Sequence, residues 1–252
     1  MTNDYESDAL LSEYLLLHYG NADDGMPYAF GPRDALDFPQ RCVDELLQKD
    51  ILPADATALD VGCAVGRSAL ALSEYCVSVT GLDLSQRFVD TAQAMVDQGH
   101  VDHWIAEEGH IRTPRRFSVP AACNRERVSF RVADAMALSQ DLGQYDVVMM
   151  ANLICRTPDP ARCLREGMAR VKPGGQLLLT TPYTWLETFT APEAWLGAQD
   201  DGAPRGREGV AAILSTTFSL RHRQDMPFCI REHARKFQWS VADASVWMKH
   251  DA

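Results

Sequence analysis

The first part of the chain has apolar positions at helical spacing. Residues 7–20 place several leucines and Tyr14 on one face, so they predict an amphipathic helix that ends at Gly20. A loop punctuated by glycine and proline follows at residues 21–32. A second helix is predicted over residues 38–47, because its early proline is tolerated in a first helical turn.

From residue 58 onward, short apolar runs alternate with helical patterns. Strands are predicted at residues 58–61, 77–82, 127–132, 145–150 and 176–181, and helices at 68–74, at 85–96 and around Leu164 and Met168. The last of these helices is expected to end at the turn signal Lys172-Pro173-Gly174-Gly175. Such alternation predicts an α/β fold with a parallel sheet and right-handed crossovers.

Two segments fall outside this alternation. Residues 99–124 are an insertion that could form a hairpin turning near Gly109, and residues 218–249 predict C-terminal strands with a break at Pro227. We expect a single domain over residues 1–252, in which residues 1–50 form a helical lid.

The end of the first predicted strand carries an unusual turn. It has the pattern Asp-x-Gly-x-x-x-Gly, whereas a dinucleotide-binding turn has G-x-G-x-x-G. A carboxylate at this place would repel a pyrophosphate but suits a ligand with an ammonium and a sulfonium group. S-adenosylmethionine has both. The predicted contacts are Asp60, Gly62, Cys63, Ala64, Gly66 and Arg67.

Further polar residues follow the other strands. Asp83, with Leu84, is placed to bind the ribose hydroxyls, Asp134 with Ala135 to meet the adenine amino group, and Asn152 lies at the carboxyl edge where α/β sheets bind ligands. Each also has an ordinary explanation, such as a helix N-terminal acid for Asp83. Their occurrence together at strand ends favours a cofactor site.

With these motifs the chain resembles class I methyltransferases, and more narrowly the C-terminal methyltransferase domain of ovothiol synthase. The matching stretches are residues 15–20, 58–67, 79–88, 151–154, 182–187, 195–197, 227–232 and 235–238. The resemblance implies a Rossmann-like, doubly wound, seven-stranded and mostly parallel sheet with an antiparallel C-terminal strand, an N-terminal helical lid and an inserted hairpin. Ala64 stands where the generic motif has a third glycine.

The resemblance also implies an activity. S-adenosylmethionine would give its methyl group to an imidazole ring nitrogen of 5-thiohistidine, forming ovothiol A and S-adenosylhomocysteine. A selenium analogue of thiohistidine is the alternative substrate, and which ring nitrogen is methylated stays open. The sulfoxide synthase that precedes the domain in the fused enzyme is not in this sequence, so a separate enzyme is expected to supply the thiolated or selenylated histidine.

Methyl transfer from a sulfonium mainly requires alignment of the reacting atoms and exclusion of water. The expected catalytic residues are Asn152, Tyr183 and His18, which would fix the ring. The expected substrate-binding residues are Tyr14, His18, Tyr19, Asn152, Tyr183, Phe228, Arg231 and Lys236. Arg231 and Lys236 fit a carboxylate anchor, or equally solvated charges on a strand.

The formal net charge of −11 and the lack of basic runs argue against nucleic-acid and membrane partners. The N-terminus resembles no signal peptide, and seven scattered cysteines fit a reducing cytoplasm. The spacings of His100, His103 and His110 match no zinc site, so no metal is expected.

Two other functions remain open, and so does the oligomeric state. One is methylation of a phenol, amine or thiol of another natural product, for which the cofactor half would look the same. The other is a non-catalytic protein that binds the cofactor as a partner or sensor.

Overall fold

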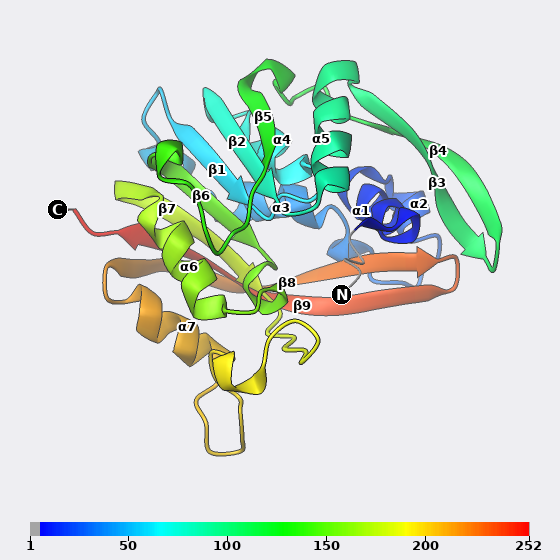
Figure 1. Cartoon of the computed structure of the whole chain (residues 1–252). Helices are drawn as coiled ribbons and strands as arrows, with labels where there is room; N and C mark the ends of the chain where they lie inside the picture. Colours follow the sequence, from blue (N-terminus) through cyan, green and yellow to red (C-terminus); the bar gives the residue numbers. More distant parts are fainter. Residues whose placement is uncertain (1–5, 252) are drawn as a thin grey trace.

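The computed structural model describes residues 6–251, which contain one seven-stranded sheet in the order β5-β2-β1-β6-β7-β9-β8 (Figure 1). The strands are β1 (Thr57–Val61), β2 (Ser78–Asp83), β5 (Val128–Val132), β6 (Tyr145–Ala151), β7 (Val171–Thr181), β8 (Phe218–His233) and β9 (Lys236–Lys249). The strands from β5 to β7 in that order are parallel, whereas β9 is antiparallel to both neighbours. The predicted mostly parallel sheet with an antiparallel C-terminal strand is confirmed.

The helices are α1 (Asp8–Tyr19), α2 (Ala22–Gly25), α3 (Phe38–Leu46), α4 (Arg67–Leu72), α5 (Gln86–Gln98), α6 (Pro160–Ala169) and α7 (Gly206–Leu214). Helices α1, α3 and α5 begin where the sequence signals place them. The Ser7 and Ser85 hydroxyls accept hydrogen bonds from the backbone N–H groups of Leu10 and Phe88, at 3.2 and 3.1 Å, so both serines cap their helices. Helices α2 and α7 were not predicted. Residues 1–5 of the predicted lid lie outside the described range.

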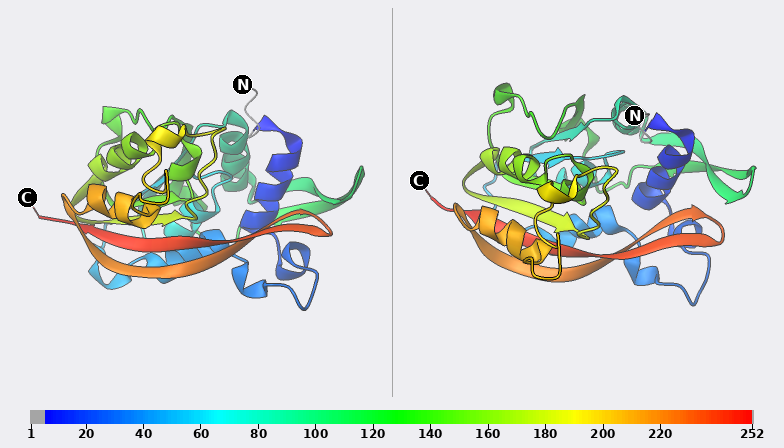
Figure 2. Two further views of the ribbon diagram at one scale, coloured as in Figure 1. Left: turned by 90° about the horizontal axis from the view of Figure 1, so that it is seen from below. Right: turned by 60° about the horizontal axis from the view of Figure 1, so that its bottom comes forward.

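A separate two-stranded sheet forms the insertion, from β3 (His100–Glu108) and β4 (Ile111–Ser118). The C-terminal strands make a second hairpin, because β9 pairs with β7 only from Asp243 to Met248 and its earlier part pairs with β8 alone. Helix α1 stands between the two hairpins (Figure 2). The Ser12 hydroxyl donates to the Trp104 carbonyl of β3 at 2.6 Å.

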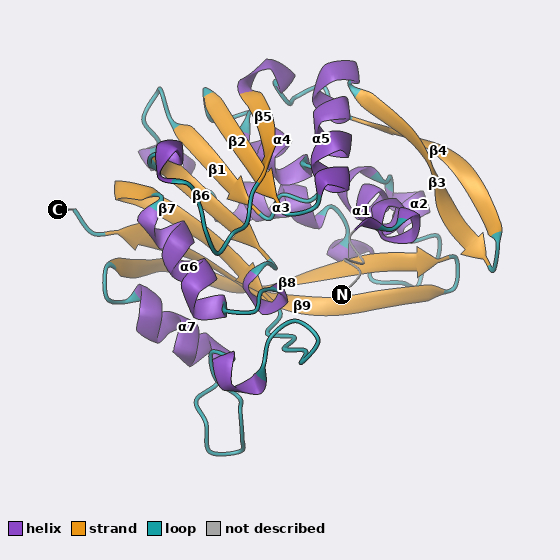
Figure 3. Cartoon of the chain, viewed as in Figure 1, coloured by secondary structure: helices purple, strands orange, loops and turns teal. Residues whose placement is uncertain are grey.

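Helices cover both faces of the sheet (Figure 3). Successive residues of β6 alternate between two hydrophobic cores, with Val147 and Met149 facing α3, α4 and α5 and Val148 and Met150 facing α6 and α7. This double burial explains why β6 is apolar at consecutive positions, as expected of a central parallel strand.

Two boundary predictions were wrong. Helix α6 ends at Ala169, and Lys172 to Gly175 form an irregular start to β7, where pairing shifts from Tyr145↔Val171 to Val147↔Gln176. Pro227 does not break β8. The strand lies at the sheet edge, where a missing N–H costs no ladder bond, and the Pro227 carbonyl accepts from Arg41 Nη1 at 3.0 Å.

Within residues 6–251 no helix has both the length and the apolar character needed to cross a bilayer.

Candidate functional site

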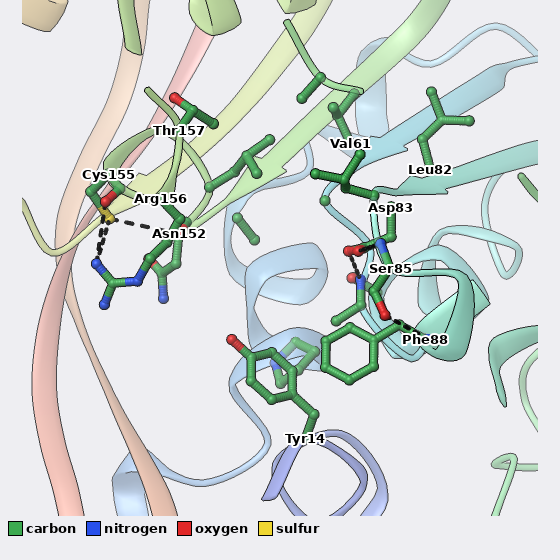
Figure 4. Close-up of a pocket in the computed structure, with 18 of the residues that line it drawn as sticks. Tyr14, Val61, Leu82, Asp83, Ser85, Phe88, Asn152, Cys155, Arg156 and Thr157 are labelled. Atoms are coloured by element: carbon green, nitrogen blue, oxygen red, sulfur yellow. Dashed lines mark hydrogen bonds between the residues drawn. The ribbon is translucent and has the colours of Figure 1, made fainter. Parts of the chain in front are cut away.

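A pocket lies at the carboxyl ends of the parallel strands (Figure 4). The strand ends contribute Gly62, Asp83, Asp134 and Asn152 to its wall. The opposite wall comes from Tyr14 and His18 of α1, Phe38 of α3 and Phe228 of β8. The sheet edge, the N-terminal helices and the C-terminal hairpin therefore enclose one space.

The turn after β1 needs its two glycines for different reasons. At Gly62, with a φ of +77°, a Cβ atom would lie 2.8 Å from the Leu153 side chain at the pocket. At Gly66, with a φ of +86°, it would lie 2.4 Å from the Phe130 ring. Ala64 also has a left-handed backbone, with a φ of 46°, and its N–H donates to Asp83 Oδ2 at 2.9 Å. The hydrogen bond holds the turn against the end of β2.

Asp60 is buried directly beside this turn. Its Oδ2 accepts from the Ser68 hydroxyl at 2.7 Å, but its Oδ1 has no hydrogen-bond partner in the described part of the chain. Burial raises the pKa of Asp60 to about 7, an effect that the Ser68 hydrogen bond opposes. Asp60 does not itself line the pocket, although its partner Ser68 does. A buried carboxylate oxygen without a donor fits a cationic ligand group, such as the ammonium of S-adenosylmethionine.

Asp83 and Asp134 lie on the pocket wall as predicted, together with Leu84 and Ala135. Both oxygens of Asp83 accept backbone N–H groups at 2.9 Å, from Ala64 and Ser85, and can still accept hydroxyls through their other lone pairs. Burial raises the pKa of Asp83, whereas those hydrogen bonds act in the opposite direction.

Asn152 follows β6 with a left-handed backbone, at a φ of 51°. Its Oδ1 accepts from the Thr180 hydroxyl at 3.0 Å, which fixes the amide. Its Nδ2 group has no hydrogen-bond partner among residues 6–251, so it can donate to a ligand in the pocket.

His18 presents a neutral ring to the pocket. Burial, together with the positive charge of Arg67, lowers the pKa of His18 to about 3. Its Nδ1 accepts a long hydrogen bond of 3.4 Å from the Arg67 backbone N–H, so Nε2 carries the proton and acts as a donor. Tyr14, one turn earlier, packs against Phe88 with ring centres 5.0 Å apart.

Other predicted residues support the site without lining it. The Tyr19 hydroxyl donates to the Val65 carbonyl at 2.8 Å, and Cys63, Gly66 and Arg67 shape the turn and the start of α4. The prediction that Tyr183 faces the methyl group does not match its placement. Its hydroxyl donates to Asp243 Oδ2 of β9 at 2.7 Å, which directs it away from the pocket.

Arg231 and Lys236 also lie away from the pocket, in the outer part of the C-terminal hairpin. Arg231 is buried, where it pairs with Glu107 at 2.7 Å and donates to the Asp24 carbonyl at 2.6 Å. Lys236 pairs with Glu232 at 2.6 Å on the surface. The structure thus gives both residues protein partners and not the place of a carboxylate anchor.

The sequence interpretation missed Arg156, which lines the pocket close to Asn152 (Figure 4). The signal was its position, four residues after Asn152 in the loop that follows β6. Cys155 was missed with it, in the same segment, and Phe38 and Ile230 were missed because their contact with the pocket depends on elements far apart in sequence.

Comparison with known proteins shows which family the chain belongs to. Residues 31–236 match the family model of a methyltransferase domain. The chain belongs to this methyltransferase family. Ubiquinone biosynthesis O-methyltransferases are among its curated relatives: the protein of Leptothrix cholodnii is 27% identical over 197 residues, 77% of this chain and 72% of the relative.

Other relatives match over shorter regions. The corresponding enzyme of Coxiella burnetii is 26% identical over 123 residues, which are 49% of this chain and only 42% of the relative. The 2-methyl-6-phytyl-1,4-hydroquinone methyltransferase of a Synechocystis strain is 33% identical over 131 residues, 52% of this chain and 33% of the relative. None of these three is a thiohistidine methyltransferase.

Solved structures show the same fold. Magnesium protoporphyrin IX methyltransferase from Synechocystis PCC 6803, with bound S-adenosylhomocysteine, superposes with a TM-score of 0.58 at 17% identity over 98% of this chain and 97% of that one. The [4+2]-cyclase SpnF gives 0.58 at 16% identity over 98% and 95%. Because one of the two is named as a cyclase, the fold alone does not decide the reaction.

Proposed function

We propose that this chain transfers the methyl group of S-adenosylmethionine to a small cyclic molecule. The observation that carries the proposal is that one pocket is lined on one side by the glycine turn, Asp83 and Asp134 and on the other by Tyr14, Phe38 and Phe228. The first set fits the cofactor, and the aromatic set fits a flat apolar ring. Family membership supports the reaction type.

The cofactor supplies an activated methyl group, so the chain mainly has to orient the acceptor. Asn152 Nδ2 and His18 Nε2 are the donors available for that task. His18 cannot also act as a base, because its Nδ1 accepts a backbone N–H and its pKa is far below neutrality. The remaining carboxylates on the wall, Asp83 and Asp134, belong to the proposed cofactor end.

Because His18, Asp83 and Asp134 are not available as a base, the acceptor atom itself has to be free of a proton. The names of the curated relatives favour a ring hydroxyl of a quinol-like natural product, which would have to lose its proton. The pocket favours an atom that already has a free lone pair at neutral pH. The ring nitrogen of 5-thiohistidine, or of its selenium analogue, meets this condition when the molecule binds in its thiolate–imidazole form, in which the chalcogen carries the negative charge and one ring nitrogen has already lost its proton to solvent. A separate enzyme would supply that substrate, and no nucleic acid or membrane would be needed.

A mass-spectrometric assay tests the proposal. The protein and S-adenosylmethionine are offered 5-thiohistidine, its selenium analogue, ergothioneine, histidine and a catechol side by side. We expect methylation of a ring nitrogen, with plain histidine much poorer because the chalcogen contacts are lost.

Other outcomes discriminate among the alternatives. Methylation of the catechol oxygen alone would favour the quinol-like acceptor and contradict the ring-nitrogen assignment, as would a methyl group located on sulfur or selenium. Tight cofactor binding without methylation of any of these compounds would contradict the ring-nitrogen assignment and leave methylation of another natural product or the non-catalytic function.

A further inference from the structure

Arg156 stands out among the residues that form the pocket. It ends the short helix η6 (Ile154–Arg156) after β6, close to Asn152 and across the pocket from Asp83 and Ser85 (Figure 4). No other lysine or arginine of the described chain lines the pocket. A positive charge therefore lies beside Asn152, where the acceptor is proposed to bind, and opposite Asp83, which is proposed to bind the ribose of the cofactor.

The protein holds one side of this guanidinium in place. Nη1 donates to the carbonyl oxygens of Cys155 at 3.2 Å and Thr184 at 3.0 Å. The guanidinium carbon also lies 5.2 Å from the centre of the Phe189 ring. These contacts fix the plane of the group before any ligand arrives, which lowers the entropic cost of binding.

The other side of the guanidinium is unengaged. Nε and Nη2 make no hydrogen bond to residues 6–251, and no carboxylate there forms an ion pair with Arg156. Arg207, Arg223 and Arg231, by contrast, all have acidic partners. The Nε–Nη2 edge is the fork that matches the two oxygens of a carboxylate.

We propose that Arg156 binds a carboxylate of the acceptor, so that the substrate class is a small cyclic acid. The assignment rests on the proposed function of the pocket and narrows its substrate. It gives Arg156 the role that the sequence suggested for Arg231 and Lys236. With the carboxylate held by Arg156, the ring of the acceptor can extend toward Asn152 and the wall formed by Tyr14 and Phe228.

Binding of acids and their methyl esters tests this assignment. Dissociation constants are measured by calorimetry on the protein loaded with S-adenosylhomocysteine, for 5-thiohistidine, for 3,4-dihydroxybenzoate and for the methyl ester of each. We expect the wild type to bind at least one acid about tenfold or more tightly than its ester, the scale of a hydrogen bond to a charged group. In R156M this preference should vanish.

Two further variants sharpen the comparison. R156K should keep only part of the preference, because an ammonium lacks the planar fork. R165M removes the same charge from an exposed position of α6 outside the pocket, and it should behave as the wild type.

Equal binding of acid and ester by the wild type, failure of both acids to bind, or a preference that survives in R156M would overturn the assignment. A loss of affinity for S-adenosylmethionine in R156M, with the acid preference intact, would also overturn it, since Arg156 would then hold the carboxylate of the cofactor. Methyl transfer is measured separately: an acid that binds through Arg156 without being methylated leaves the assignment in place and contradicts the proposed function.

Discussion

Asp60 combines burial with a carboxylate oxygen that lacks a partner in the described chain. Its pKa is raised by burial to about 7, from the 3.8 that is ordinary for an aspartate. Between these two values the folded protein holds a proton that the unfolded chain has lost. The contribution of Asp60 to stability is therefore complete below the lower value and is lost as the pH rises through the higher one.

We predict opposite effects of Asp60→Asn on stability and on cofactor binding. Without bound cofactor, the Asp60→Asn variant should lose less stability than the wild type when the pH rises toward 8, because no buried charge forms at position 60. Its affinity for S-adenosylmethionine should be lower, and only the wild type should gain affinity as the pH rises through about 7. Chemical denaturation and calorimetry across this range check both parts, with the exposed Asp97→Asn on α5 as control. Equal affinities at every pH would remove Asp60 from the cofactor site.

Asp83 is placed to act on the ribose and on the glycine turn together. Asp83→Ala should weaken S-adenosylmethionine binding by about 1–3 kcal/mol, through lost hydrogen bonds to a charged group and a less ordered turn at Ala64. Calorimetry on a variant with wild-type circular dichroism measures the effect. Unchanged affinity in a folded variant would contradict the ribose assignment.

The sequence located side chains that follow strand ends but not those whose direction depends on a distant partner. Asp83, Asp134 and Asn152 were found on the pocket wall because the carboxyl ends of parallel strands meet at one edge. Tyr183 bonds to a residue 60 positions away and Arg231 to one 124 positions away. No local pattern contains those pairings, so both residues were placed in the site and Arg156 was overlooked.

Among the elements, the two hairpins and α2 meet at Arg231. The side chain is 5% exposed, and it joins Glu107 of β3 to the Asp24 carbonyl of α2. The Ala234 N–H donates to the Glu107 carbonyl at 3.2 Å and joins the same two hairpins. Arg231 therefore stabilises the frame around α1.

We predict that Arg231→Met lowers the free energy of unfolding by about 1–3 kcal/mol, because it removes one partner of a largely buried pair and leaves the Asp24 carbonyl without its donor. Thermal and chemical denaturation measure the loss. Lys236→Met should change stability little, since the Lys236 side chain is largely exposed to solvent, which weakens its pair with Glu232. If Arg231→Met instead kept its stability and raised the KM for an acidic substrate, the carboxylate-anchor hypothesis for Arg231 would be restored.

Helices and strands could be predicted where buried residues recur at regular spacing along the chain. The ends of an element could not be predicted where they depend on its position in the sheet. The apolar run of β6 and the serine caps of α1 and α5 are local signals that the fold preserves. Pro227 and the segment Lys172–Gly175 would end an element in isolation. They persist inside β8 and β7 because an edge strand tolerates a missing N–H and a bulge absorbs a register shift.

At the scale of the whole molecule, α1 belongs both to the pocket and to the hydrophobic core on one face of the sheet, where Leu11, Leu15 and Leu16 are buried. Tyr14, Leu17 and His18 form pocket wall, while Ser12 and Tyr19 tie the helix to β3 and to the glycine turn. A ligand that binds the closed pocket must therefore stabilise the docked state of α1.

Amide hydrogen exchange tests this coupling between the cofactor and α1. S-adenosylmethionine should slow exchange in α1 as well as in the turn after β1, because a ligand specific for the docked state suppresses local opening. Helix α7 contributes nothing to the pocket and should exchange at the same rate with and without the cofactor. Asp83→Ala, at cofactor concentrations too low to saturate it, should show no added protection of α1. Protection of the turn without protection of α1 would mean that the helix does not close over the cofactor, and its pocket residues would then have to act on the acceptor alone.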